Sequence, residues 1–467
     1  MRIPRFIGGK VLLLGILAPG LVHASDQAGP AALTLEQAVA IALERNQQAL
    51  MARQQSDVLK GRYREVRAQA LPTLNFNGSA LRWRDPSFLN ASSFDKIPIE
   101  FREGLTPVGA NLFDYNLSLS QPIYTSGKVG TALKLASLES EGVGADIART
   151  EQDIRQRVIR AFYDLILADR LLGVARANVE LYRQHVEMAR ARRAAGVATE
   201  VDVLRSQVNL ANAQPELLRA ENSLRHARSL LNNLLVRPID YPTEALGELN
   251  FVPGPKMDVQ VVVRHAVEHR PELQRLRINE LEADAQKKLA NAENRLRVDF
   301  NGQYGFSARQ PSNLGNHTFT RWMFTLSMTL PLFDGGRRSG LFQQAVAQRK
   351  VTELQRSDQE NSVRLEAQTA VDELDRAEKT VQAAQLNVHQ AEKVLAMMQD
   401  NYRYGAATTL DVTDAQAALT AARWNLLQGL HDHTLARAQL HWVMGQDPVQ
   451  GLQAEAKPGD VHGQDGN

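Results

Sequence analysis

Apolar residues recur along two long segments of the chain in alternating steps of four and three. In the first segment this ladder consists of Ile154, Val158, Ala161, Leu165, Ala168, Leu172, Ala175, Val179, Tyr182, Val186 and Ala189. The second segment has the same ladder 209 positions later, at Val363, Ala367, Ala370, Leu374, Ala377, Val381, Ala384, Val388, Ala391, Leu395 and Met398. This period is typical of a coiled-coil seam.

Proline is missing from both segments. The sequence has no proline between residues 122 and 215, and neither glycine nor proline between residues 340 and 405. We therefore expect one uninterrupted helix in each half, at about 128–195 and about 337–403. A helix of about 65 residues is about 100 Å long, which is too long for a compact globule.

Each ladder is followed by a glycine and a second, shorter apolar repeat. Gly196 and Gly405 begin the related segments Gly-Val-Ala-Thr and Gly-Ala-Ala-Thr. The repeats after them predict helices at about 199–236 and about 408–445. Because the intervening turns are short, each long helix and its follower should be antiparallel, with the glycines at the tips.

Four short segments, at about 74–84, 112–122, 298–308 and 320–331, alternate apolar and polar residues as strands do. Each is close to the roughly 9 to 11 residues with which a tilted strand spans a bilayer. Of the 27 aromatic residues, 15 lie within 74–124 and 298–333, as aromatic girdles of membrane strands would require. One such strand alone would suit a soluble sheet, but four strands carried on very long helices favour a membrane protein.

Four strands are too few to close a barrel, since the smallest transmembrane barrels have about eight. Strand edges cannot stay open in hydrocarbon, so several copies must pool their strands. Two copies would supply eight strands and three copies twelve. Because eight-stranded barrels are filled by side chains, a water-filled passage favours at least three copies.

The chain is a duplicated unit. Residues 75–78 recur 224 positions later, and 117–124 recur 209 positions later, with a longer loop in the first copy accounting for the difference. We predict a first structural repeat at 25–240, a linker at 241–257 and a second structural repeat at 258–448. Each repeat contains a helix, two strands, a long helix and a return helix.

Both ends of the chain differ from the repeats. Arg2, Arg5 and Lys10 precede an apolar stretch, and small residues follow at positions suited to a cleavage site. Residues 1–24 are therefore predicted to be a secretory signal peptide. The Gly-, Asp- and Gln-rich residues 449–467 are predicted to be a disordered tail.

Composition excludes several classes of function. The 467 residues include 54 Lys and Arg against 52 Asp and Glu, a net charge of +2, which argues against nucleic-acid binding. Cysteine is absent, so disulfides, thiol catalysis and a lipidated N-terminal cysteine are excluded. No catalytic motif occurs, and His431 and His433 are interpreted as packing or surface residues. We predict a protein that is not an enzyme and has no cofactor or metal.

These features resemble the TolC-type family of outer-membrane efflux ducts over about residues 33–448. The most specific matches are Leu-Pro-Leu-Phe-Asp-Gly-Gly at 330–336, Tyr-x-x-Gly at 402–405 and Leu-Asp-Val-x-Asp at 410–414. The resemblance implies an α+β membrane protein of the Gram-negative outer membrane. It implies a homotrimer with a 12-stranded transmembrane β-barrel in lipid and a long antiparallel helical coiled-coil barrel extending into the periplasm.

The resemblance also implies partners and a role. The helical end would dock to a periplasmic adaptor (membrane fusion) protein and an inner-membrane transporter of RND, ABC or MFS type. The protein would be the passive exit duct of a tripartite efflux or type I secretion system. The alternative that the residues leave open is a structural coiled-coil envelope tether or adhesin without a conducting lumen.

By resemblance, the helical tips would close the duct. Asp411 and Asp414 would form stacked carboxylate rings at the periplasmic aperture, with Asp202 at the corresponding place in the first repeat. Tyr402 would contribute to the contacts that keep the aperture shut. The alternative for each aspartate is helix N-capping beside Thr199 or Thr408.

The chain departs from the family pattern at one position of the aperture. The family prototype has an arginine two residues after the second glycine, whereas this chain has Ala407. Arg403 is the candidate for the missing cation.

Overall fold

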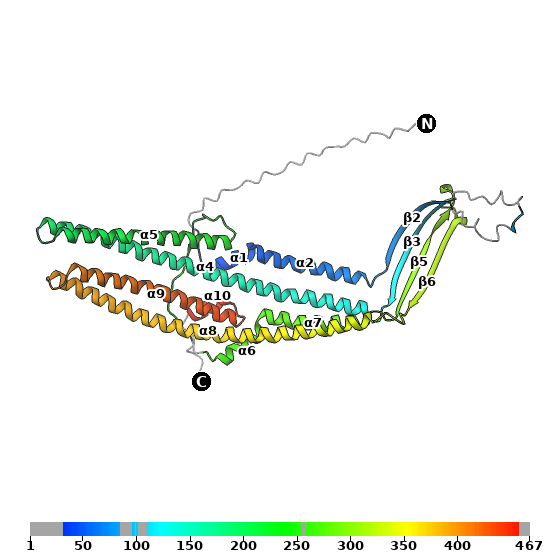
Figure 1. The fold of residues 1–467 in the computed structure, drawn as a ribbon. Helices are drawn as coiled ribbons and strands as arrows, with labels where there is room; N and C mark the ends of the chain where they lie inside the picture. The colour runs from blue at the N-terminus through cyan, green and yellow to red at the C-terminus, as the bar shows by residue number, and fades with distance from the viewer. Residues whose placement is uncertain (1–30, 85–95, 99, 101–109, 255–256, 457–467) are drawn as a thin grey trace, which may run out of the picture.

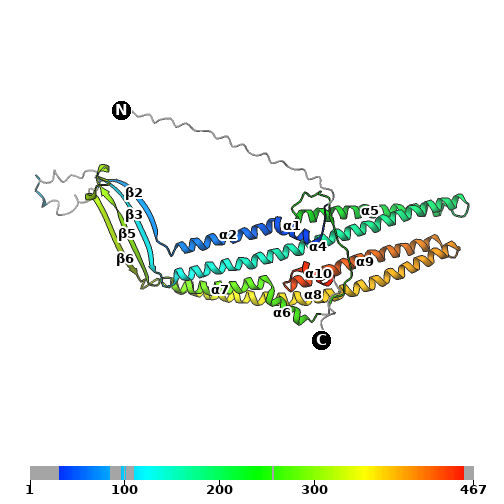
Figure 2. The same ribbon diagram turned by 180° about the vertical axis from the view of Figure 1, so that it is seen from behind.

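The computed structural model describes residues 31–84, 96–98, 100, 110–254 and 257–456, so the predicted signal peptide lies outside the described residues. The described chain is long and narrow, with a layer of long helices and a four-stranded sheet at one end (Figures 1 and 2). Among the described residues, no helix has a stretch long and apolar enough to cross a bilayer.

Two helical hairpins form most of the molecule. In the first, α4 (Lys128–Ala194) is followed by α5 (Glu200–Leu234), and in the second, α8 (Arg337–Arg403) is followed by α9 (Thr409–Val443). The two hairpins lie side by side through a contact between α4 and α9. Their free tips are at the end of the molecule opposite the sheet (Figure 1).

Shorter helices complete the layer toward the sheet. These helices are α1 (Leu35–Arg45), α2 (Gln47–Ala68), α6 (Val259–His269) and α7 (Pro271–Ala292). Helix α2 packs on α4, and α7 packs on both α4 and α8. Across the layer the order is therefore α5, α4, α9, α8 near the tips and α2, α4, α7, α8 near the sheet (Figures 1 and 2).

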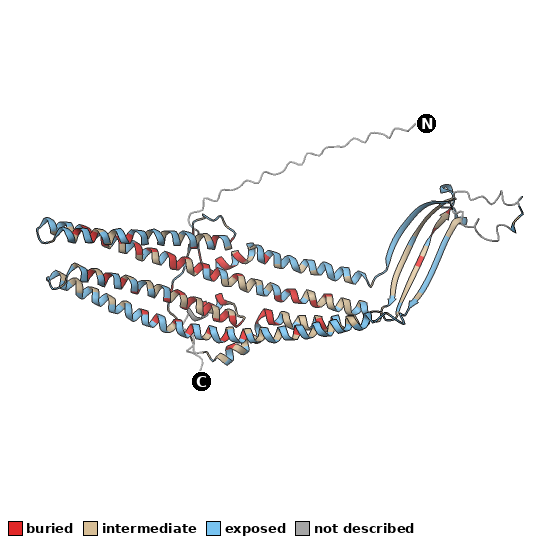
Figure 3. Cartoon of the chain, in the orientation of Figure 1, coloured by how far each residue is buried: buried red, intermediate tan, exposed pale blue. Residues whose placement is uncertain are grey.

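The buried residues follow the predicted seams (Figure 3). On α4 the ladder is buried from Ile154 to Val186, and only Ala189 at its end is half-buried. On α8 the ladder is buried from Val363 to Ala384, and its last four residues are half-buried. Near the middle of the molecule, α1 and α10 (Pro448–Ala456) add their apolar faces to α4, whereas α6 packs on α8.

The sheet joins the two halves of the chain. Its strands are β2 (Thr73–Trp83), β3 (Ala110–Tyr124), β5 (Arg297–Ala308) and β6 (Thr320–Thr329), all antiparallel in the order β2-β3-β5-β6. Strand β3 is longer than the expected 112–122, because its pairing with β5 continues past an irregularity near Pro122. No other described strand pairs with the outer edges of β2 and β6.

The strand register confirms the predicted two-faced character of the sheet. One row across the sheet consists of Phe76, Leu117, Tyr304 and Trp322, which oppose one another in turn. The next row, on the other face, consists of Asn77, Asn116, Gly305 and Arg321. Hydrogen bonds connect this polar face: Asn77 donates to Asn116 at 3.1 Å, and Asn116 donates to Asp114 at 2.9 Å.

Short elements lie outside the hairpins and the four-stranded sheet. A parallel pair joins β1 (Ala31–Leu33) to β4 (Thr243–Ala245) in the predicted linker. Farther along this segment, the Gly254 amide donates to Glu378 of α8 at 2.9 Å. Two 3-10 turns, η4 (Pro311–Asn313) and η5 (His317–Phe319), connect β5 to β6.

The predicted disordered tail is wrong for its first residues. Pro448–Ala456 form helix α10, whose first turn is capped by Asp447 accepting from the Val449 amide at 3.0 Å. Val449 and Leu452 lie three residues apart, so they share a helix face, and both are buried in the core on α4 and α9. Composition did not indicate this short amphipathic face. Residues 457–467 lie outside the described residues.

The close packing of β5 on β3 predicts the effect of adding one methyl group at Gly305. A Cβ at Gly305 would overlap the backbone carbonyl of Tyr115 on β3, whereas at Gly78 it would meet only a ring atom of Phe76 at 3.9 Å. We expect Gly305→Ala to destabilise the fold by about 1–3 kcal/mol, as overpacking typically does. The melting temperature in detergent, followed by circular dichroism, measures this. Equal effects of Gly305→Ala and the control Gly78→Ala would contradict the register.

Candidate site at the helical tips

Gly196 and Gly405 form the same turn in the two hairpins. Their φ angles of 75° and 77° are left-handed, a conformation that glycine adopts without steric cost. In the first turn the Val197 amide donates to the Arg192 carbonyl at 3.0 Å, and in the second the Ala406 amide donates to the Asn401 carbonyl at 2.8 Å. These are Schellman bonds, which end the long helices and reverse the chain within a few residues.

Asp202 and Asp411 both cap the helices that start after these turns. Asp202 Oδ2 accepts from the amide and hydroxyl of Thr199 at 2.9 and 2.8 Å. Asp411 Oδ2 accepts from the amide and hydroxyl of Thr408 at 2.8 and 2.7 Å. The threonine hydroxyls accept from the aspartate amides in return, completing a capping box at each tip. The capping alternative therefore holds for both residues.

The capping bonds also set the charge of these carboxylates. Hydrogen bonds from the backbone amide and the hydroxyl of Thr408 lower the pKa of Asp411, and those of Thr199 lower the pKa of Asp202. Both side chains stay ionised at neutral pH. One oxygen of each is committed to the cap, so the other oxygen is the one directed to surroundings beyond the turn.

Asp414 is placed differently from the two capping aspartates. It is exposed and lies one turn farther into α9. Burial, followed by the charge of Asp414, raises the pKa of the buried Tyr182 on α4. Asp414 is thus the predicted aperture residue whose carboxylate has no capping role.

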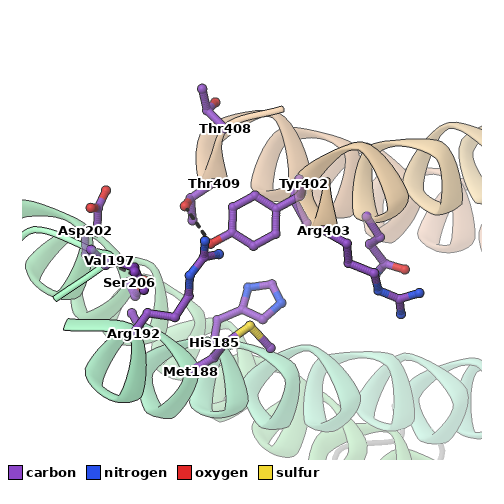
Figure 4. A pocket seen from close by; sticks show the side chains of 14 residues that line it. His185, Met188, Arg192, Val197, Asp202, Ser206, Tyr402, Arg403, Thr408 and Thr409 are labelled. Carbon is purple, nitrogen blue, oxygen red and sulfur yellow. Dashed lines mark hydrogen bonds between the residues drawn. The ribbon is translucent and has the colours of Figure 1, made fainter. Parts of the chain in front are cut away.

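A cleft of about 630 Å³ lies between the two tips. Its lining includes His185, Met188, Arg192 and Asp202 from the first hairpin, and Tyr402 and Arg403 from the second (Figure 4). The structure therefore brings Asp202 and Tyr402 to one cleft. Asp411 and Asp414 are not among its lining residues.

Tyr402 contacts the first hairpin through an arginine. The Arg192 guanidinium carbon lies 4.7 Å from the centre of the Tyr402 ring, a cation–π contact between α4 and α8 (Figure 4). The Tyr402 hydroxyl accepts a hydrogen bond from Thr409 at 3.3 Å. Arg403, which lines the same cleft, pairs with Asp400 of its own helix at 3.3 Å. Arg192 is therefore the cation that contacts the Tyr402 ring, and the role of Arg403 as the replacement cation stays a prediction.

Sequence reasoning missed Arg192 for a physical reason. Arg192 and Tyr402 occupy the last turns of two helices from different repeats, more than 200 positions apart. The ladder placed both near the tips, but it says nothing about which side chains meet between hairpins. The available signal was that Arg192 lies in the last turn, where a cation also suits the helix dipole.

A second charged contact joins the hairpins near the middle of the molecule. The largely buried His431 on α9 lies between Asp164 of α4, with Nε2 to Oδ1 at 2.7 Å, and Asp432, with Nδ1 to Oδ1 at 3.1 Å. Farther out, Arg376 of α8 interacts with the charge of Asp432. In the described part of the chain, no group of three His, Asp or Glu side chains is suited to hold a metal.

Proton binding at His431 should depend on these carboxylates. Burial lowers the pKa of His431, but hydrogen bonds and charges of Asp164 and Asp432 more than offset this, so its pKa is raised. A raised folded-state pKa gives stability that is present below the unfolded value of about 6.5 and is lost as pH rises through the folded value.

Known proteins resemble this chain over most of its length. A family model described as outer membrane efflux protein matches residues 38–236 and 262–446. Outer membrane protein OprJ of Pseudomonas aeruginosa is 25% identical over 426 residues, covering 88% of this chain and 84% of OprJ. Nodulation protein T of Rhizobium leguminosarum bv. trifolii is 22% identical over 313 residues, covering 66% of each chain.

Solved structures show the same fold. The CmeC outer membrane channel of Campylobacter jejuni superimposes with a TM-score of 0.78 at 14% sequence identity, covering 91% of this chain and 90% of that one. The duplicated hairpins and the four-stranded sheet are therefore shared at low sequence identity.

The His431 contact predicts a pH-dependent difference in stability. Wild type should melt at a higher temperature than His431→Gln below about pH 6.5, and this advantage should shrink toward alkaline pH. Thermal unfolding across this range tests it, with His389→Gln, an exposed histidine on α8, as the control. A wild-type advantage that stays constant with pH would contradict a protonated His431 between the two carboxylates.

Proposed function

Because this chain belongs to the outer membrane efflux protein family, we propose that three copies of it form the outer-membrane exit duct of a tripartite efflux or type I secretion system. The family consists of transport channels. In this proposal the duct itself performs no catalysis. It conducts what an inner-membrane transporter delivers, across the periplasm and the outer membrane.

The two different faces of the sheet are the observation that supports the proposal most directly. Its one face is apolar and exposed on the single chain, with Phe76, Trp322 and Leu326 each more than 60% exposed. Its other face is polar and hydrogen-bonded. Lipid outside and water inside account for both faces. An envelope tether without a lumen would leave the polar face unexplained.

The open edges of β2 and β6 support an assembly of three copies. In a bilayer their unpaired backbone groups need partners, which a neighbouring copy supplies when β6 of one chain pairs with β2 of the next. Three copies with four strands each give a barrel of twelve strands, which is wide enough for a water-filled passage.

The helical tips are the proposed periplasmic end. Tyr404 is 88% exposed and Val197 is 65% exposed, one at each tip. Apolar side chains at the ends of a long helical wall suit docking of a partner. We assign this end to a periplasmic adaptor protein, and through it to an inner-membrane transporter.

The same tips form the proposed gate. Each copy would contribute Asp414 and the outer oxygen of Asp411 to an acidic constriction, which favours cations and hinders anions. The contact between Arg192 and Tyr402 joins the two hairpins of one chain. We propose that this contact holds the tips in the closed arrangement.

Removing the charge of Asp414 should weaken ion selectivity. In planar lipid bilayers we expect Asp414→Asn channels to prefer cations less than wild type does, because three charges leave the constriction. Asp57→Asn on α2, far from the tips, is the matched charge control. Unchanged selectivity in Asp414→Asn would reject the acidic ring. A correctly inserted wild-type protein that conducts no ions would favour the tether.

Removing the Arg192 cation that lies over the Tyr402 ring should favour the open arrangement of the tips. A cation–π contact of about 0.5–1 kcal/mol corresponds to about a two- to fivefold shift in the local equilibrium of each copy. We expect Arg192→Gln to raise bilayer conductance. Adding Tyr402→Leu to the same chain should raise the conductance little further. The control is Arg193→Gln, which removes a neighbouring arginine that pairs with Glu200 at 3.2 Å. Equal conductance of the Arg192 and Arg193 variants would contradict this gate.

A further inference from the structure

The two repeats match element by element. Adding 209 to the bounds of α4 and α5 gives the bounds of α8 and α9, and adding 224 to those of α1 and α2 gives α6 and α7. For each contact between the first and second repeats of one chain, shifting both residues by the repeat offset therefore gives a counterpart pair of positions. In a ring of copies, the counterpart joins the second repeat of one chain to the first repeat of the next.

The contacts inside one chain are polar at two well-defined places. Gln156 on α4 donates to Gln439 on α9 at 2.6 Å. Nearer the sheet, Gly142 on α4 lies against the guanidinium of Arg275 on α7, which fills the space where a Cβ would stand. We call this boundary between the repeats the internal joint.

The counterparts of these four residues are all apolar. Gln156 corresponds to Leu365 and Gln439 to Leu230, while Gly142 corresponds to Val351 and Arg275 to Met51. On the single chain, Leu365 is 68%, Leu230 44%, Val351 44% and Met51 62% exposed. Leu365 and Val351 lie on α8, at one edge of the layer, and Leu230 and Met51 lie on α5 and α2, at the other edge (Figure 1).

From this correspondence we infer the helix register between copies: α8 of one chain packs on α5 and α2 of the next, with Leu365 against Leu230 and Val351 against Met51. The inference rests on the proposed ring of copies. It explains why large apolar side chains are exposed on opposite edges of the single chain. A second copy of this chain is the occupant, because its opposite edge carries exposed apolar residues at the counterpart positions.

The charged contact inside the chain has no counterpart at this subunit joint. Asp164 corresponds to Glu373 and His431 to Asn222, so this histidine–carboxylate pair is not repeated there. Glu373 already pairs with Arg376 of its own helix. The pH dependence expected from His431 therefore belongs to the internal joint and not to the contact between copies.

Thiol cross-linking tests the register directly, because the chain has no cysteine of its own. The double variant L230C/L365C, in outer-membrane vesicles, is treated with a short bifunctional thiol reagent and analysed by denaturing electrophoresis. We expect covalent dimers and trimers, with no larger species. V351C/M51C should give the same ladder.

Two control variants test whether the reagent can span two nearby thiols and whether the helix register between copies is correct. Q156C/Q439C places the thiols at the internal joint, so it should cross-link within one chain and give no ladder. L230C/L386C moves one thiol about 30 Å along α8, at 1.5 Å per residue, and should not cross-link.

The outcomes separate this inference from the proposed function. A wild-type trimer, established by its mass in detergent, together with no ladder from L230C/L365C would overturn the register while the duct proposal stands. A ladder from L230C/L386C that equals that from L230C/L365C would also overturn it. Absence of a trimer in wild type would reject both.

Discussion

The backbone hydrogen bonds at the two outer edges of the sheet are the constraint on which this structure depends. Strands β2 and β6 have no partner on their outer sides within the described chain, yet their neighbours β3 and β5 are fully paired. In water such edges would be tolerated, but in hydrocarbon they would cost several kcal/mol for each unpaired group. The lipid-suited face of the sheet therefore makes the single chain an incomplete unit.

Duplication supplies a way to complete that unit. The constant offsets between the repeats mean that the helices of both halves begin and end at equivalent heights, so a wall can continue from one repeat to the next and from one copy to another. The two kinds of joint differ in chemistry at matched positions, whereas elsewhere in the internal joint Leu427 and Leu435 of α9 pack on the apolar core of α4. Glutamines, an arginine and a histidine serve the internal joint, whereas leucine, valine and methionine are left exposed at the outer edges. A stable contact within a chain can be polar, but separate copies need apolar burial to offset the entropy of association.

Much of this fold could be predicted from the sequence, because its signals are local and periodic. The ladder from Ile154, the glycines at 196 and 405 and the alternation around Trp322 each report on one element. The site was less predictable. Asp202 and Asp411 have the spacing of capping residues and of aperture residues alike, and only the folded structure shows the capping bonds. Arg192 on Tyr402 depends on how two distant helices lie beside each other, which no local pattern records. The helix of Val449 and Leu452 was too short for periodicity to reveal.

The number of copies is the quantity that tests this account most directly. Native mass spectrometry of the protein released from outer-membrane detergent extracts would count the chains in the folded assembly without any substitution. We expect three chains, with no folded species of one chain. A stable, folded single chain, its β2 and β6 edges left open in the detergent micelle, would contradict it.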